Sequence, residues 1–489
     1  MENSWIIIYG NKETDKRAIS ILDGKRREYC ALPARTLSAD FVTEQDLSEN
    51  NLIIVGKADE NAVLRELIAE KYLEQCTCAQ EYSIAVLSSK WNGEKKMIVA
   101  SGYDFNGVLY GAIDLINLYF GGEVFTKINM RFENPDTYAV PFSPVMPDYK
   151  RRSRPSVKER GIWTWGTCIY DYKKFFDHML QLKLNMVVIW NDFVPTNAKK
   201  IVKYAHECGI QVIWGYSWGW ENKGAVVTDF ADPKNVQEWK KCIYEKYLRE
   251  YADTNADGIY FQSFTERNEN TVNGKNVAEL VTSWVNAISD EFYKNEKDIR
   301  IQFGLHATSV NRDLAHLEGV DKRMDIVWED CGAFPFDYLP QRTENFEETA
   351  AFTRKVATLR GKDDKFGVVL KGMSVLNWAL FRHATESNLL GEEEEEFFKR
   401  RMVYKEPQWR ILQGIWLKNY KLAHRLVSDL VKIKRGELCV QMLVEDGLFE
   451  EKVWFPVALM AEILWDDGAV SDQLLQRVAL FPDVYFANL

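Results

Sequence analysis

Residues 160–192 read RGIWTWGTCIYDYKKFFDHMLQLKLNMVVIWND, and this stretch decides the fold. Its two ends, Gly161–Gly166 and Met186–Trp190, are short apolar runs of the kind that form buried strands. The apolar residues between them recur at helical spacing: Phe175, Phe176, Met179, Leu180 and Leu182. The stretch therefore predicts a strand, a helix and a second strand, which make one β/α unit.

The same unit repeats along the chain as far as Met373. Five further strands are expected, at Ile210–Tyr216, Gly258–Phe264, Ile301–His306, Ile326–Glu329 and Gly367–Met373. Continuous apolar runs of this kind are typical of parallel strands that helices cover on both faces. No glycine-rich phosphate turn follows any of them, so a barrel is favoured over a doubly wound nucleotide-binding sheet. The eighth strand is not placed; Ser374–Trp378 is the candidate.

Three domains are expected, and this barrel is the middle one. Residues 1–140 alternate short strands with one-sided helices and carry no paired carboxylates or phosphate loop, which predicts a supporting α/β domain. Residues 134–158 hold five prolines and read as a linker. Residues 156–380 form the (β/α)8 TIM-like barrel, and residues 381–489 are expected to form a mainly helical domain. The fold class is therefore α/β.

Composition limits the class of protein. The formal net charge is −10, whereas a nucleic-acid partner calls for a basic face. No run of 18 apolar residues exists and the first residues lack signal-peptide features, so we expect no membrane span and a cytoplasmic location. The sequence leaves two alternatives open: a leader peptide that was removed before residue 1, and a homo-oligomeric state.

The sequence contains no motif typical of a metal site or of the catalytic serine of a serine hydrolase. The eight cysteines lack metal-site spacing, and the six histidines include no helical pair with a glutamate between them. No Gly-x-Ser-x-Gly elbow is present. We therefore expect no metal and no cofactor.

Aromatic and polar residues gather where the predicted strands end. Eight of the 16 tryptophans lie at or just beyond these ends, where barrels of this type carry their active sites. Aromatic rings cover the C–H faces of sugars, and carboxylates and amides bind sugar hydroxyls, so the set favours a carbohydrate site; core filling is the alternative for any single tryptophan. The candidate substrate-binding residues are Trp165, Trp190, Asp192, Trp220, Arg267, His306 and Trp378.

Glycoside cleavage usually needs two carboxyl groups. Glu266 closes the fourth predicted strand, and an apolar barrel mouth would raise its pKa into the range of a proton donor. A salt bridge with Arg267 is the structural alternative. The second catalytic carboxylate is expected to be Glu329 or Asp330, and Asp192 and Glu221 are the next candidates. For each of these acids, a solvated loop position or a helix cap is the alternative.

Two short motifs resemble known proteins. Residues 103–112, YDFNGVLYGA, resemble the closing helix of the non-catalytic N-terminal domain of family 20 β-hexosaminidases and of α-glucuronidases. Arg160-Gly161-Ile162-Trp163 is similar to the start of the first barrel strand in those families. The resemblance implies a supporting domain before a catalytic TIM barrel, and it implies Glu266 as the acid.

The chain departs from family 20 at one position. Those hexosaminidases end strand four with an Asp-Glu pair, whereas this chain has Thr265-Glu266. A threonine supplies no carboxylate to orient an N-acetyl group, so an α-glucuronidase-like or other exo-acting hydrolase fits better, with Arg267 available to a uronic acid. The alternatives are a non-catalytic carbohydrate-binding protein on the same scaffold, or another barrel hydrolase or lyase that acts on a small molecule.

Overall fold

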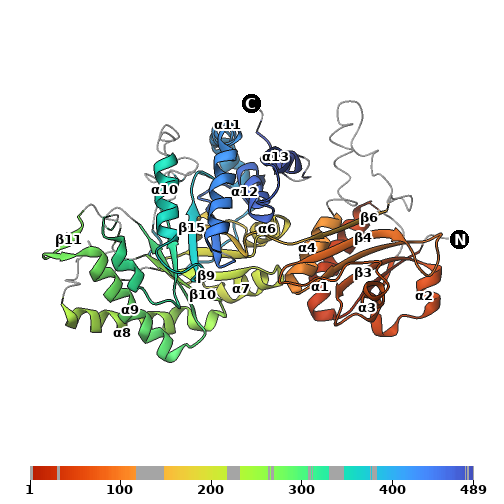
Figure 1. Cartoon of the computed structure of the whole chain (residues 1–489), viewed down its shortest axis with the longest axis horizontal. Coiled ribbons are helices and arrows are strands. Elements are labelled where there is room, and N and C mark those ends of the chain that lie inside the picture. Colours follow the sequence, from red (N-terminus) through yellow and green to blue (C-terminus); the bar gives the residue numbers. More distant parts are fainter. Residues whose placement is uncertain are drawn as a thin grey trace. The chain divides into compact units, whose positions relative to one another are not determined.

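The computed structural model describes residues 4–29, 34–116, 148–216, 218, 232–262, 265, 269–306, 310, 312–329, 346–374, 376, 381, 383–434, 436–479, 481 and 484–487. These residues fall into two compact units (Figure 1). The first comprises residues 1–155 and 479–483, and the second residues 156–478 and 484–489. Within the described ranges, no helix has the length and apolar character needed to cross a membrane.

The first unit is built on a six-stranded sheet in the order β2-β1-β3-β5-β4-β6. Its strands are β1 (Trp5–Tyr9), β2 (Ala34–Ser38), β3 (Asn51–Lys57), β4 (Tyr82–Ser88), β5 (Lys96–Gly102) and β6 (Tyr149–Ser153). Strand β4 runs antiparallel to both of its neighbours, and the other pairs are parallel. The helices are α1 (Lys12–Tyr29), α2 (Glu44–Glu49), α3 (Ala62–Ala69) and α4 (Phe105–Leu115), with a 3-10 turn at Ala39–Phe41.

Strand β6 lies inside the stretch that the sequence predicted as a linker. Its side chains alternate in exposure, and two arginines on it find acidic partners within the same unit. Arg151 pairs with Asp114 at 3.2 Å, and Arg152 pairs with Glu81 at 2.8 Å. A charged edge strand of this kind shows no apolar run, which is why the prolines around it dominated the prediction.

The motif that carried the family resemblance has a packing role. Asp104 accepts a hydrogen bond from the backbone N–H of Gly107, 2.8 Å away, and so caps α4. A Cβ atom at Gly107 would lie 2.3 Å from the carbonyl oxygen of Glu81, so only glycine lets this helix approach the sheet so closely. This part of the motif therefore specifies the supporting unit rather than its chemistry.

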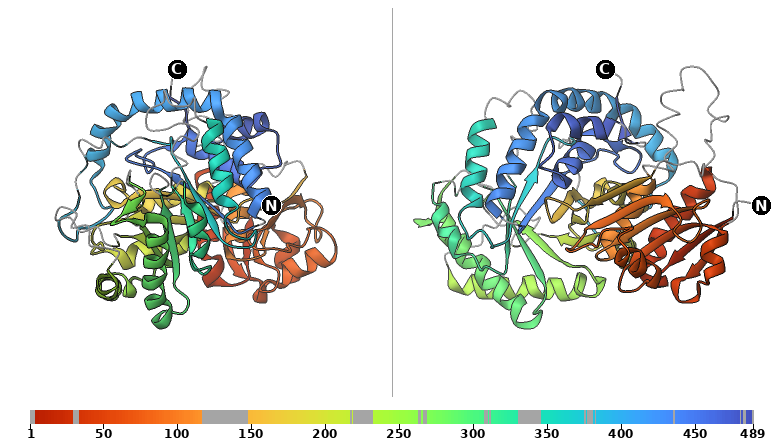
Figure 2. Two further views of the ribbon diagram at one scale, coloured as in Figure 1. Left: turned by 60° about the vertical axis from the view of Figure 1, so that its left-hand side comes forward. Right: turned by 45° about the vertical axis from the view of Figure 1, so that its right-hand side comes forward.

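The second unit is a closed barrel of eight parallel strands, as the sequence predicted (Figure 2). In chain order the strands are β7 (Glu159–Trp165), β8 (Met186–Trp190), β9 (Gln211–Gly215), β10 (Gly258–Gln262), β13 (Arg300–Leu305), β14 (Asp325–Trp328), β15 (Phe366–Leu370) and β16 (Leu438–Leu443). The helices are α6 (Tyr172–Gln181), α7 (Ala198–Glu207), α8 (Pro233–Glu250), α9 (Val277–Asn295), α10 (Phe346–Ala357), α11 (Glu395–Lys434), α12 (Phe455–Trp465) and α13 (Ser471–Ala479). The smaller elements are 3-10 turns at Gly166–Cys168, Ala252–Thr254 and Leu314–Gly319, the hairpin β11 (Thr271–Val272) and β12 (Lys275–Asn276), and the pair β17 (Val453–Trp454) and β18 (Val484–Tyr485).

The eighth strand is β16, not the candidate at residues 374–378. Strand β16 pairs with β15 on one side and with β7 on the other, and so closes the barrel. It follows the 40-residue helix α11, so the last β/α connection is much longer than the others. The boundary expected at residue 380 therefore falls inside the barrel unit, and α11 is the helix that precedes strand eight.

The amino-terminal mouth of the barrel is closed by an ion network. The Arg300 guanidinium lies 2.8 Å from Glu159 and 2.8 Å from Asp325. Above this network the interior is filled by side chains from alternate positions of the strands: Trp163, Met186, Val188, Trp190, Ile213, Tyr260, Val327, Val369, Cys439 and Leu443. The barrel is a packed core, and its largest aromatic residues lie towards the carboxyl ends of the strands.

Candidate active site

Four aromatic rings form the floor of the carboxyl-terminal barrel mouth. Trp163 and Trp165 are two residues apart on β7 and therefore point to the same face. The ring centroid of Trp190 lies 6.2 Å from that of Trp163 and 5.8 Å from that of Trp165, and Tyr260 is 5.9 Å from Trp163. The structure thus brings together two of the predicted binding residues, Trp165 and Trp190. Trp190 is buried, whereas Trp165 is half-buried.

Beside this floor the buried side chain of Glu329 is held by three partners. Its residue directly follows β14. The Tyr260 hydroxyl donates to Oε1 and the Gln262 amide donates to Oε2. The His306 Nε2 lies 2.6 Å from Oε2. Donors from two other strands therefore converge on one carboxyl group, and they join the predicted catalytic Glu329 to the predicted binding residue His306.

Thr265 occupies the position that the resemblance singled out. Its side chain is buried, and its hydroxyl oxygen accepts a hydrogen bond from the backbone N–H of His306, 3.2 Å away. The residue therefore ties the end of β10 to the end of β13 next to Glu329. The candidates Glu266, Asp330, Trp220, Arg267 and Trp378 lie outside the described residues, as does Glu221.

Asp192 contacts a segment that follows β15. Its carboxylate accepts hydrogen bonds from His383 Nδ1 at 3.0 Å and from the backbone N–H of Ala384 at 3.1 Å. The same segment covers Trp165, since the ring of Phe381 lies 5.0 Å and the ring of His383 lies 6.2 Å from that of Trp165. Asp192 thus holds this segment against the aromatic floor.

Sequence reasoning missed Glu445, which lies two residues beyond β16 and is 1% exposed. Its Oε1 accepts a hydrogen bond from the indole N–H of Trp165 at 3.3 Å. The Ser374 hydroxyl binds the backbone of Glu445 twice, accepting from the N–H at 2.6 Å and donating to the carbonyl at 2.9 Å. Burial raises the pKa of Glu445 to about 7, and the nearby Lys371 opposes that rise only in part.

Two further acids follow Glu445 in the same loop. Asp446 accepts from the Tyr170 hydroxyl at 2.7 Å and pairs with Lys405 at 2.9 Å and with Arg401. Glu450 accepts from the backbone N–H of Tyr170 at 2.7 Å, and burial raises its pKa to about 8. The acids after strand eight obey the same strand-end rule that selected Glu266 and Glu329, and would have been found had β16 been recognised as a strand.

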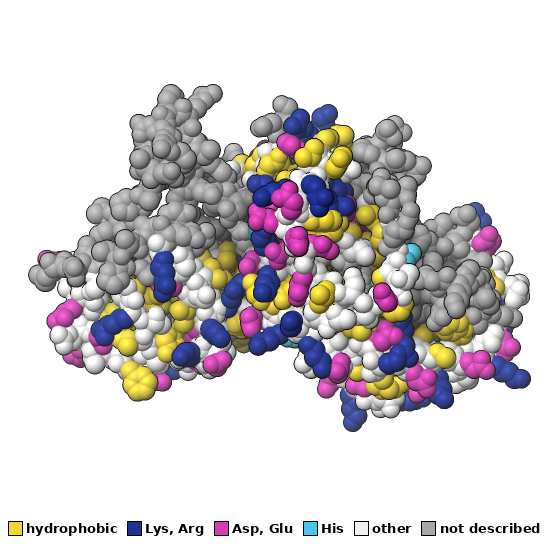
Figure 3. All heavy atoms as spheres, turned by 180° about the vertical axis from the view of Figure 1, so that it is seen from behind, with side chains coloured by type: hydrophobic (Ala, Val, Ile, Leu, Met, Phe, Trp, Pro, Cys, Tyr) yellow, Lys and Arg dark blue, Asp and Glu magenta, His cyan; other side chains and the backbone are white. Residues whose placement is uncertain are grey.

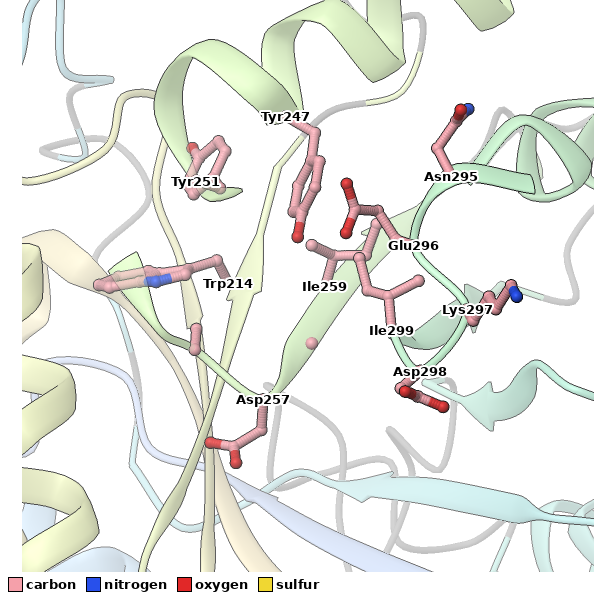
Figure 4. Close-up of a pocket in the computed structure, with 12 residues that line it drawn as sticks. Trp214, Tyr247, Tyr251, Asp257, Ile259, Asn295, Glu296, Lys297, Asp298 and Ile299 are labelled. Carbon is pink, nitrogen blue, oxygen red and sulfur yellow. The ribbon is translucent and has the colours of Figure 1, made fainter. Parts of the chain in front are cut away.

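A cavity of about 460 Å³ lies at the opposite end of the barrel (Figure 4). Its lining comes from the end of α8, the residues that lead into β10 and the loop between α9 and β13: Tyr247, Tyr251, Asp257, Glu296 and Ile299 among them. In barrels of this type, the residues at this end usually contribute to stability, and catalysis takes place at the other end. The cavity is therefore separate from the aromatic floor.

The described residues contain no group of three or more His, Cys, Asp or Glu side chains that could hold a metal ion. On the face that Figure 3 shows, basic and acidic side chains alternate, and the picture shows no continuous basic surface among the parts drawn in colour. Neither observation points to a phosphate-rich ligand on that face.

Solved glycoside hydrolases share this fold. The structure of CpGH84B is 11% identical in sequence, with a TM-score of 0.53, and the match covers 98% of this chain and 70% of that one. The GH20 β-N-acetylhexosaminidase from Streptomyces coelicolor A3(2) is 10% identical, with a TM-score of 0.52, over 100% of this chain and 94% of that enzyme. No known family model and no curated protein matches the sequence. At these identities the likeness extends to the fold alone.

Proposed function

We propose that this protein is an exo-acting glycoside hydrolase whose substrate binds over Trp165 at the carboxyl-terminal mouth of the barrel. The observation that carries the proposal is the convergence of Tyr260, Gln262 and His306 on Glu329. A buried carboxyl group held by several donors beside aromatic rings is suited to stabilise positive charge on a sugar ring. The same fold in solved glycoside hydrolases supports this reading.

In the proposed reaction a carboxylic acid gives its proton to the glycosidic oxygen as the bond from that oxygen to the sugar breaks. The sugar carbon then receives a hydroxyl group from water, whose remaining proton returns to a carboxylate. Glu266 is the proposed proton donor, because it comes four residues after the end of β10 in the sequence. Only one strand, β13, separates β10 from β14, the strand that Glu329 follows. Glu329 is the proposed partner, acting as base or nucleophile.

Glu445 is a second candidate for the proton donor. Its raised pKa of about 7 keeps a large fraction of its side chain protonated near neutral pH, as general acid catalysis requires. It also contacts Trp165, the ring that the proposed substrate covers. Separate substitutions of Glu266 and Glu445 distinguish the two candidates. The variant that lacks the proton donor should keep its activity on substrates whose leaving group departs without a proton and lose it on the others.

The identity of the sugar forms the second part of the proposal. Thr265 offers no carboxylate to an N-acetyl group, and its hydroxyl is occupied by the His306 backbone. This favours an α-glucuronidase-like substrate, and Arg267 is the basic residue proposed to bind a uronic acid. A hexosaminidase-like substrate is the second candidate, because the Streptomyces coelicolor enzyme of the same fold is a β-N-acetylhexosaminidase.

A panel of aryl glycosides tests these proposals. Release of a poorly activated aryl group, such as phenol, from a uronide or an N-acetylhexosaminide, and the loss of that release in Glu266→Gln, would support the hydrolase and name its sugar. Tight binding of a sugar without turnover, unchanged in Glu266→Gln and Glu329→Gln, would instead indicate a carbohydrate-binding protein. Turnover that requires an added divalent metal would indicate the lyase or metal hydrolase.

A further inference from the structure

Helix α11 has one face packed inward and another face on which large apolar side chains are exposed. Trp409, Leu412 and Trp416 are buried on its inner side. On the outer side, Val403 is 71% exposed, Tyr404 is 78% exposed and Ile411 is 59% exposed. In Figure 2 this helix arches along one edge of its unit. Pro407, which interrupts the helical hydrogen bonds, is exposed between these residues.

The outer face has an internal symmetry about Pro407. Val403 and Ile411 lie four positions before and after it, and Glu396 and Lys418 lie eleven positions before and after it. Both charged residues are exposed. An antiparallel partner with the same sequence would place each apolar residue against an apolar one and each acid against a base.

We propose that α11 is the dimerisation helix of this protein, pairing antiparallel with α11 of a second copy around a two-fold axis at Pro407. Val403 of each copy then packs on Ile411 of the other, and the two glutamates at position 396 meet the two lysines at position 418. Tyr404 lies opposite Arg410, whose guanidinium is available at the surface and pairs only with Glu406 within the described residues, at 3.2 Å. A cation over an aromatic ring adds to such a contact.

Seven residues from its centre, this interface has room for close approach. Gly414 lies on the same face, and a Cβ atom built on it would meet no atom within 4 Å. In the proposed pairing, the long side chain of Arg400 faces Gly414. A membrane surface would accept the basic residues beside this face, such as Arg400, Arg410 and Lys418, but it offers no partner to Glu396, which a second copy pairs with a lysine.

The mass of the full chain in solution, measured by light scattering and sedimentation over concentrations of about 1 to 100 µM, tests the proposal. We expect a dimer that Tyr404→Lys converts to monomer, because that change places a charge at the centre of the interface. Val470→Lys is the matched control, since Val470 is 61% exposed outside α11 and its substitution should leave the mass unchanged. A wild-type chain that stays monomeric, or a dimer that survives Tyr404→Lys, contradicts the proposal.

A charge exchange tests the antiparallel register. Glu396→Lys and Lys418→Glu should each weaken the dimer about tenfold, because the two-fold axis makes every change count twice. The two residues are too far apart on one helix to contact each other, so the double variant restores the pairs only between copies. A dimer that the double variant does not restore excludes this register. Both measurements are independent of any glycosidase activity.

Discussion

Trp165 donates its indole N–H to the carboxyl group of Glu445, 3.3 Å away, and so joins the first and the eighth strands of the barrel at their carboxyl ends. Trp165 also touches Trp163, Trp190 and the segment after β15. One half-buried ring is therefore in contact with the aromatic floor, with a covering segment and with a buried acid. Changes at this pair should appear in the pH dependence of any activity at the site.

The Glu445→Gln variant is expected to change the alkaline limb of the rate profile. If the protonated acid is the active form, kcat/KM of the wild type falls as pH rises through about 7, where Glu445 ionises. In Glu445→Gln this limb should be absent. In Trp165→Phe it should move to higher pH, because the indole hydrogen bond lowers the pKa of Glu445. Wild-type and Glu445→Gln profiles of the same shape would remove Glu445 from the reaction.

Loss of the Glu329 carboxylate should lower kcat by a factor of about 10² to 10⁴, with a folded protein retained. Tyr260→Phe removes one of its donors and should cost about tenfold. Steady-state kinetics with an aryl glycoside measures both effects. Glu348→Gln, an exposed acid on α10, is the control and should behave as wild type. Full activity in Glu329→Gln would contradict the catalytic assignment.

Glu450 should make the protein less stable as pH rises. Its pKa is about 8 in the folded state and 4.5 in an unfolded chain, so unfolding releases a proton between these values. The free energy of unfolding should therefore fall between about pH 4.5 and 8, by an amount on the order of 5 kcal/mol. Urea denaturation of Glu450→Gln should show a smaller fall. The exposed-acid control, Glu238→Gln, should keep the wild-type pH dependence.

The close approach of α4 to its sheet predicts a contrast between two glycines. Gly107→Ala forces a Cβ atom to within 2.3 Å of a backbone oxygen and should destabilise the first unit by about 1–3 kcal/mol. Gly24→Ala, in the exposed part of α1, meets no atom within 4 Å and should stabilise by about 0.5–1 kcal/mol. Thermal unfolding of the two variants should shift in opposite directions; a shift in the same direction would contradict this account of the motif.

Periodicity predicted most of the barrel because its parallel strands are continuous apolar runs. The same rule applied to LCVQML at 438–443 would have found β16, but the long helix before it favoured an all-helical end. The acids Glu445 and Glu450 were missed for that reason alone. Strand ends also predicted the proximity of Trp165 and Trp190, and of Glu329 and His306.

Other contacts could not be predicted from one sequence. The pairing of Asp192 with His383 joins residues 191 positions apart, through a segment with no periodicity. The raised pKa of Glu445 depends on how tightly several loops enclose it, and the sequence carries no measure of that enclosure. The six assignments at Glu266, Asp330, Trp220, Glu221, Arg267 and Trp378 stay predictions.

The position of β16 in the chain also bears on how the protein is made. Trp163 pairs with Leu443 where the first and eighth strands close the barrel. During synthesis, β7 therefore has no partner on this side until nearly the whole unit has left the ribosome. Until then β7 and β15 both present bare strand edges, which are templates for intermolecular association, and contacts of such long range form slowly. Fragments that stop short of residue 438 should therefore accumulate as insoluble material, and production of the intact chain should benefit from chaperones that shield these edges.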